Sequence, residues 1–262
     1  KDIEKRILIE GEMLGLPRQF PDIGPKAVKG IELNGYAAEL ARVTIWIGEI
    51  QWMIANGYGA KRNPILQPLE QIEHRDALLN MDGTEALWPA ADAIVGNPPF
   101  LGGNKKRREL GDTQFERLDH VFGDRVPGAA DLVCYWFDKA KIQIETGKCK
   151  RAGFVSTQSI RNGFSRRVLD AIAEKLAITR AWSDEPWVNE GAAVRVSAVV
   201  FCREAGLAAI KLNDLTVASI NSDLTSGDGI NITHATAMTA NQSIVYQGSK
   251  KVGPFEVAGS DA

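Results

Sequence analysis

The segment Asn97-Pro98-Pro99-Phe100 contains the residue types best suited to chemistry in this sequence. Proline lacks a backbone N–H and disfavours helical backbone in the residue before it, so this turn is rigid and presents mainly hydrogen-bond acceptors. The side-chain oxygen of Asn97 and the carbonyl of Pro98 could accept both hydrogens of an amine and direct its lone pair toward an electrophile. The Phe100 ring offers a face on which a planar ring can stack. The competing interpretation is a rigid turn at a strand end with a phenylalanine in the core.

Two carboxylates follow other short segments that we expect to be strands. Glu32 comes directly after Val28-Lys29-Gly30-Ile31, which is the position where an acid commonly holds ribose hydroxyls. Asp76 follows Ile72-Glu73-His74-Arg75 in a similar way. Each acid taken alone is also consistent with an ordinary surface carboxylate. Their order and their spacing relative to Asn97 favour a shared site.

Basic residues lie close to the double-proline turn. The run Lys105-Lys106-Arg107-Arg108 follows Gly102-Gly103, and we expect it to form a loop that contacts nucleic-acid phosphates. Arg161, near the start of a later helix, is expected at the same edge of the sheet. The competing interpretation of these charges is a solvated surface. Segment 182–187, Trp-Ser-Asp-Glu-Pro-Trp, is expected to be a loop whose tryptophans pack structurally, with contact to a base as the alternative.

Composition restricts the class of protein. The chain has 262 residues, of which 44% are hydrophobic and 24% charged, with a formal net charge of -2, so it is not a disordered or fibrous protein. No apolar run approaches the ~20 residues of a membrane span and no signal peptide opens the chain, so we expect a cytoplasmic protein. The cysteines and histidines show no ligand spacing, which predicts reduced thiols and no metal site.

Hydrophobic periodicity predicts the elements that position these residues. Helices are expected over 1–14, 36–55, 131–145 and 166–176, and strands over 27–32, 69–73, 91–95, 152–156, 178–182 and 194–201. Short apolar strands that alternate with helices predict an α/β fold, a doubly wound parallel sheet with helices on both faces. Ligands bind such sheets at the carboxyl ends of the strands, so Glu32, Asp76 and Asn97 should share one edge.

Segment 94–103, Ile-Val-Gly-Asn-Pro-Pro-Phe-Leu-Gly-Gly, resembles the catalytic motif of amino-methylating DNA methyltransferases. Together with 131–137 and 182–187, it is most similar to the MmeI-type (type IIG/IIL) restriction–modification enzymes. This resemblance implies a Rossmann-like class I fold and transfer of a methyl group from S-adenosylmethionine to N6 of a flipped adenine at specific sites in double-stranded DNA. It implies that Glu32 holds the cofactor's ribose, Asp76 its adenine, and that Asp131 lies near it.

The resemblance also implies the roles of the remaining segments. Asn97, Pro98, Pro99 and Phe100 form the catalytic motif, with Phe100 stacking on the target base. Segment 194–201 would be an antiparallel strand. Residues 1–205 would form the methyltransferase core, whose first strand and glycine-rich motif are expected to precede Lys1, and 206–262 a linker and the start of a target-recognition domain. A nuclease domain of the same polypeptide is a further expected partner.

Three other functions stay open on the residues alone. Asn-Pro-Pro-aromatic turns also serve methyltransferases that act on RNA bases and on protein glutamine, because all these targets present a planar nitrogen. A catalytically silent piece that only helps to bind DNA is the third.

Overall fold

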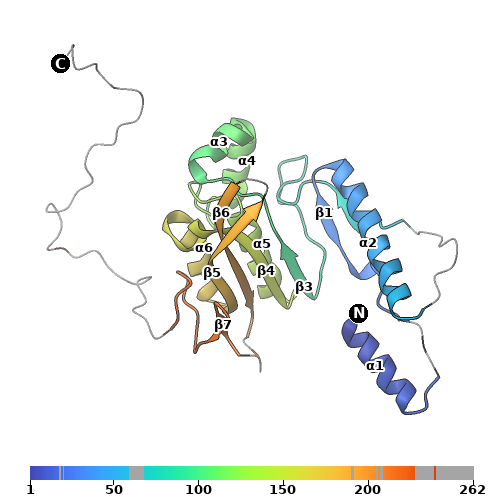
Figure 1. Ribbon diagram of the computed structural model, residues 1–262. Helices are drawn as coiled ribbons and strands as arrows, with labels where there is room; N and C mark the ends of the chain where they lie inside the picture. Colours follow the sequence, from blue (N-terminus) through green and yellow to red (C-terminus); the bar gives the residue numbers. More distant parts are fainter. Residues whose placement is uncertain are drawn as a thin grey trace, which may run out of the picture.

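The computed structural model describes residues 1–17, 19, 21–58, 68–189, 192–204, 206, 209–227 and 239. It contains two separate sheets (Figure 1). The smaller pairs β1 (Gly30–Glu32) with β2 (Ile72–His74) in parallel. The larger has six strands in the order β3-β4-β6-β5-β7-β8. These strands are β3 (Ala93–Gly96), β4 (Arg151–Thr157), β5 (Ala177–Asn189), β6 (Ala192–Cys202), β7 (Lys211–Leu212) and β8 (Leu215–Thr216).

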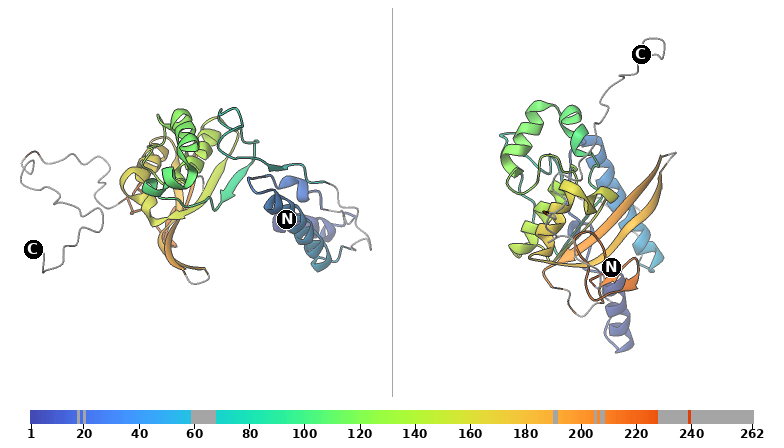
Figure 2. Two further views of the ribbon diagram at one scale, coloured as in Figure 1. Left: turned by 90° about the horizontal axis from the view of Figure 1, so that it is seen from above. Right: turned by 90° about the vertical axis from the view of Figure 1, so that its left-hand side faces the viewer.

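Six α-helices accompany the sheets in the described part of the chain: α1 (Asp2–Met13), α2 (Gly35–Ala55), α3 (Gly103–Leu110), α4 (Asp112–Phe122), α5 (Cys134–Glu145) and α6 (Gly163–Ala173). Two short 3-10 turns, η1 (Pro25–Ala27) and η2 (Gln158–Arg161), precede β1 and α6. Helices α5 and α6 pack against the larger sheet, whereas α2 packs against the smaller sheet (Figure 2). This arrangement is an α/β fold consistent with the class I methyltransferase fold.

The strand directions of the larger sheet are mixed. Strands β3 and β4 are parallel, whereas β6 runs antiparallel to both β4 and β5. The expectation of an antiparallel strand over 194–201 is therefore confirmed. The expected loop over 182–187 is wrong, because this segment lies within β5. A register shift between Trp182 and Glu185 accommodates the polar residues between them without ending the strand.

Two other regions differ from the sequence-based expectations. The basic segment expected to be a loop is helix α3, since Lys, Arg, Glu and Leu are good helix formers and Gly111, with φ 79°, ends the helix. The methyltransferase core was expected to end at residue 205, but β7 pairs with β5 and Ile220 and Leu224 are buried in the core. Helix α4 and strands β7 and β8 were not predicted.

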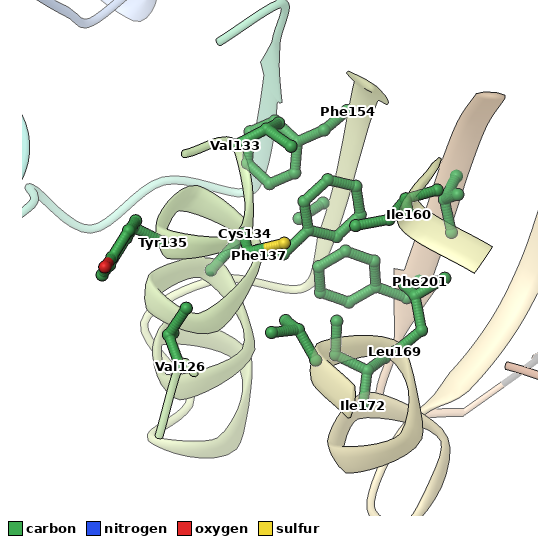
Figure 3. Close-up of a cluster of buried hydrophobic side chains, with 14 of the residues drawn as sticks. Val126, Val133, Cys134, Tyr135, Phe137, Phe154, Ile160, Leu169, Ile172 and Phe201 are labelled. Atoms are coloured by element: carbon green, nitrogen blue, oxygen red, sulfur yellow. The ribbon is translucent and has the colours of Figure 1, made fainter. Parts of the chain in front are cut away.

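The main core lies between the larger sheet and helices α5 and α6. Three aromatic rings meet there: Phe137 lies 5.1 Å from Phe154 and 5.9 Å from Phe201, measured between ring centroids. Figure 3 shows these rings with Leu169 and Ile172 of α6 packed beside them. All five side chains are buried, so the carboxyl ends of β3 and β4 project from a rigid base.

The smaller sheet is positioned mainly by α2 and by the connection to β3. Asn34 caps α2, because its side-chain oxygen accepts hydrogen bonds from the backbone N–H groups of Tyr36 (2.9 Å) and Ala37 (3.2 Å). In the connection, Glu85 pairs with Arg125 at 2.6 Å and with Lys139 of α5 at 2.9 Å. These ion pairs attach the connection to the body of the larger sheet.

Glu32, Asp76 and Asn97, which are expected at one edge of the sheet, are divided between two sheets in the described residues. Glu32 and Asp76 belong to the smaller sheet, and Asn97 follows a strand of the larger one. In the described residues, β1 pairs only with β2 and β3 only with β4. The facing edges of β1 and β3 therefore carry unpaired backbone groups, and Val95 of β3 is 83% exposed.

Candidate functional site

The double-proline turn begins where β3 ends, at Gly96. Asn97 and Pro99 are exposed, whereas Pro98 is buried and Phe100 is half-buried against the core. Burial of Pro98 fixes the backbone and leaves the Asn97 side chain facing solvent. Phe100 packs on the core, as the structural interpretation of the turn expects, and it also lines a pocket, whereas the catalytic interpretation stays a prediction.

Asp131 fastens this turn to the rest of the protein. Its carboxylate oxygen Oδ1 accepts hydrogen bonds from the backbone N–H groups of Leu101 (3.0 Å) and Val133 (3.3 Å). The backbone N–H of Leu132 in turn donates to the Leu101 carbonyl at 3.0 Å. Asp131 is only 5% exposed, so these bonds are shielded from water. The structure gives Asp131 a positioning role, and its expected place near a cofactor stays a prediction.

A pocket of about 660 Å³ lies beside the turn. Its lining comes from the turn, from the start of α3, from the segment before α5, and from the end of β4 with the start of α6. The residues are Phe100, Gly102, Gly103, Lys105, Ala129, Asp131, Thr157, Ser159 and Phe164. The pocket combines two aromatic rings with hydroxyl groups and charges of both signs. It can therefore take a planar ligand that has a polar edge.

Among the lining residues that were not predicted from the sequence, Thr157, Ser159 and Phe164 carry hydroxyl or aromatic side chains. The available signal was the end of a predicted strand, which placed 157–159 at the ligand-binding edge. Phe164 gave a weaker signal, because a phenylalanine after Asn162-Gly163 is not distinguishable from a core residue by pattern alone.

The basic run divides into residues with different surroundings. Lys105 is exposed and lines the pocket. Arg107 pairs with Asp112 at 3.2 Å and Glu116 at 3.4 Å, and Arg108 pairs with Glu109 at 2.8 Å. These acids neutralise part of the positive charge that was expected to face phosphates. Elsewhere, Arg161 lies half-buried in η2.

Lys106 corrects the sequence-based assignment. It is 0% exposed, so it does not contact phosphate in this structure. Its ammonium donates hydrogen bonds to the Ala130 carbonyl at 3.0 Å and to the Tyr135 hydroxyl at 3.1 Å. Burial lowers the pKa of Lys106, and the nearby carboxylate of Asp131 opposes this shift. Lys106 therefore joins α3 to the segment before α5.

Glu32 and Asp76 stabilise the turns that follow β1 and β2. Glu32 Oε1 accepts the N–H of Asn34 at 2.9 Å, and Asp76 Oδ1 accepts that of Leu78 at 2.7 Å. Asp76 Oδ2 has only a 3.5 Å contact with Gln114, and Glu32 Oε2 accepts no hydrogen bond from a described residue. These oxygens can accept hydrogen bonds from a ligand with hydroxyl or amine donors.

Other classes of site find no support in the described residues. They contain no cluster of His, Cys, Asp and Glu suited to a metal ion. Across the same ranges, none of the helices combines the length and apolar character needed to cross a bilayer. The three cysteines are free thiols, with Cys134 and Cys149 buried.

Comparisons with known proteins find similarity to DNA methyltransferases. The model of the MmeI DNA-methyltransferase domain matches residues 1–215. DNA methyltransferase A of Bacillus subtilis (strain 168) is 28% identical over 188 residues, which is 68% of this chain and 21% of that protein. The solved structure of the type IIL restriction–modification enzyme MmeI in complex with DNA is 26% identical, with a TM-score of 0.63 over 86% of this chain.

The chain spans 32% of that MmeI structure, so it corresponds to one part of a larger relative. The similarity covers both sheets, the double-proline turn and the pocket beside it. The chain belongs to the MmeI DNA-methyltransferase domain family.

Proposed function

We propose that this chain carries the catalytic centre of a site-specific adenine-N6 DNA methyltransferase within a restriction–modification protein, with S-adenosylmethionine as methyl donor. The observation that carries the proposal is the exposed Asn97 on a turn fixed by the buried Pro98, beside a pocket lined by Phe100. Family membership supports methyl transfer to DNA. The acceptor pair suits an exocyclic amine, and the resemblance to the MmeI-type enzymes favours adenine N6 among such amines.

The residues of the turn act by positioning and by electrostatics. The target adenine leaves the duplex and enters the pocket, with its ring against Phe100. The Asn97 side-chain oxygen and the Pro98 carbonyl accept the two amine hydrogens, so the nitrogen lone pair points away from the ring plane. When bound, S-adenosylmethionine supplies an electrophilic methyl group. The same acceptors stabilise the positive charge that develops on the nitrogen before it loses a proton.

Glu32 and Asp76 are the proposed cofactor ligands, for the ribose and the adenine respectively. Support comes from their positions at the carboxyl ends of two paired parallel strands and from the carboxylate oxygens that remain available. Asp131 remains a proposed neighbour of the cofactor. The unpaired edges of β1 and β3 support a further parallel strand between them, whose glycine-rich turn would complete the methionine end of the site.

The remaining proposals concern the whole protein. Lys105, Arg107, Arg108 and Arg161 are proposed to contact DNA phosphates, with Lys105 the best placed because it lines the pocket. The C-terminal part of the chain would lead into a target-recognition domain, and a nuclease domain would complete the polypeptide. We propose a cytoplasmic location, where such a protein meets DNA.

The test is identification of the methylated product. The full-length protein that contains this chain is incubated with duplex DNA and S-adenosylmethionine, and the digested nucleosides are analysed by mass spectrometry. We expect N6-methyladenine from the wild type and a loss of about 100-fold or more with Asn97→Ala, by analogy with removal of one oxyanion-hole donor.

Gln51→Ala, which removes an exposed amide side chain on α2, is the control and should keep full activity. Methyl groups found only on cytosine, RNA or protein would refute the assignment, and so would near-normal activity of Asn97→Ala. Absence of all methylation with retained DNA binding would support the catalytically silent alternative.

A further inference from the structure

Phe164 is a second aromatic side chain in the pocket beside Asn97, and the proposed mechanism does not use it. It lies in the first turn of α6 and is 51% exposed, although it lines the pocket together with Phe100. The two rings come from different elements and make no ring contact with each other among the described residues. Both rings line the same pocket of about 660 Å³, which has room for a planar ligand.

The backbone holds Phe164 in this position through the residue before it. Gly163 has φ 55°, a left-handed conformation, and an added Cβ there would meet no atom within 4 Å. The requirement for glycine is thus conformational and not steric. The guanidinium carbon of Arg167 lies 5.3 Å from the centre of the Phe164 ring, one helical turn farther on. This contact favours a ring that stays over Arg167 instead of swinging freely.

Asp131 couples the positions of the two rings. Its side chain accepts a hydrogen bond from the N–H of Leu101, the residue after Phe100. Its own backbone N–H donates to the Ser165 hydroxyl at 3.0 Å, and Ser165 is the residue after Phe164. One buried residue thus anchors the neighbours of both rings. Such a fixed spacing is what stacking on a flat ligand requires, because stacking weakens quickly with distance.

We propose that Phe164 is a second wall of the site for the flipped base, acting together with Phe100. This inference rests on the proposed function and adds a base-binding residue to it. The Thr157 and Ser159 hydroxyls lie 2.6 Å apart at the end of β4 and line the same pocket. Since each hydroxyl can both donate and accept, the pair provides a polar group for the edge of the base.

The test compares DNA with and without the target base. Wild-type methylation of plasmid DNA is first mapped by sequencing, and duplexes are then made with either the target adenine or an abasic site at that position. Affinity for both duplexes and the rate of methylation are measured with full-length wild type, Phe164→Ala and Phe164→Tyr. Leu215→Ala, which shortens another exposed apolar side chain, is the control.

We expect Phe164→Ala to bind the intact duplex about 5- to 150-fold more weakly, which corresponds to about 1–3 kcal/mol of base stacking. Its affinity for the abasic duplex should match the wild type, and Phe164→Tyr should restore binding and rate. Equal weakening with both duplexes would assign Phe164 to the DNA backbone and overturn the inference, as would no change with either. These results apply while the wild type makes N6-methyladenine. If it makes none, the proposed function and this inference both fall.

Discussion

Replacing Asp131 with alanine should loosen the segment that carries Asn97 and Phe100 while leaving the aromatic core intact. The Asp131 carboxylate accepts the N–H groups of Leu101 at 3.0 Å and Val133 at 3.3 Å. A buried donor that loses its acceptor costs about 1–3 kcal/mol, and the longer bond belongs at the low end. Loss of both bonds should therefore lower the free energy of local opening by roughly 2–4 kcal/mol.

Hydrogen–deuterium exchange of the full-length protein measures this opening directly. A loss of about 2–4 kcal/mol corresponds to exchange about 30- to 700-fold faster at the Leu101 amide. Peptides from β4 and β6, which lie in the main core, should exchange as in the wild type. Asp131→Asn keeps an acceptor oxygen in the same place, so exchange at Leu101 should rise less than tenfold.

Two results would refute this reasoning. The first is exchange at Leu101 within about threefold of wild type in Asp131→Ala, which would mean that the carboxylate does not hold the turn. The second is an equal effect of the alanine and asparagine variants, which would show that the charge of Asp131 matters and its hydrogen bonds do not.

Three further predictions concern charge, ionisation and packing. Lys105→Gln should weaken binding to DNA of any sequence and reduce the slope of log affinity against log salt by about one, as measured by fluorescence anisotropy at several salt concentrations. Burial raises the pKa of the Cys134 thiol from 9.0 to about 12, so its stabilising contribution is complete below pH 9 and is lost as the pH rises toward 12. In urea unfolding, the free energy of unfolding of the wild type should therefore fall by about 2 kcal/mol more than that of Cys134→Ala between about pH 8 and pH 10.5. Gly103→Ala should lower the melting temperature and reduce the free energy of unfolding by about 2 kcal/mol or more, because the added Cβ would lie 1.9 Å from the Ala129 carbonyl oxygen. In the control Gly102→Ala, the added Cβ meets no atom within 4 Å, so the loss should be less than about 0.5 kcal/mol.

Local features of the sequence determined several parts of this protein. Two successive prolines fix the turn at 97–100 whatever surrounds it, because the restriction on the backbone is built into the residues. Asn34 caps α2 through hydrogen bonds to residues two and three positions away, which sequence spacing alone specifies. The short strands around Glu32, Asp76 and Asn97 and the antiparallel strand near 194–201 follow equally from local patterns or from the family motif. All four were predicted within a few residues.

The tertiary structure decided which of the candidate residues face the site. Lys106 stands in a basic run that looks uniformly exposed, yet it is 0% exposed because α3 packs against Ala130 and Tyr135. Asp131 holds the turn in place because its carboxylate accepts a hydrogen bond from Leu101, which is 30 positions away in the chain. Phe164 entered the pocket because α6 begins beside it. Burial and hydrogen bonds between distant segments depend on how whole elements pack, and no local pattern of residue types contains that information.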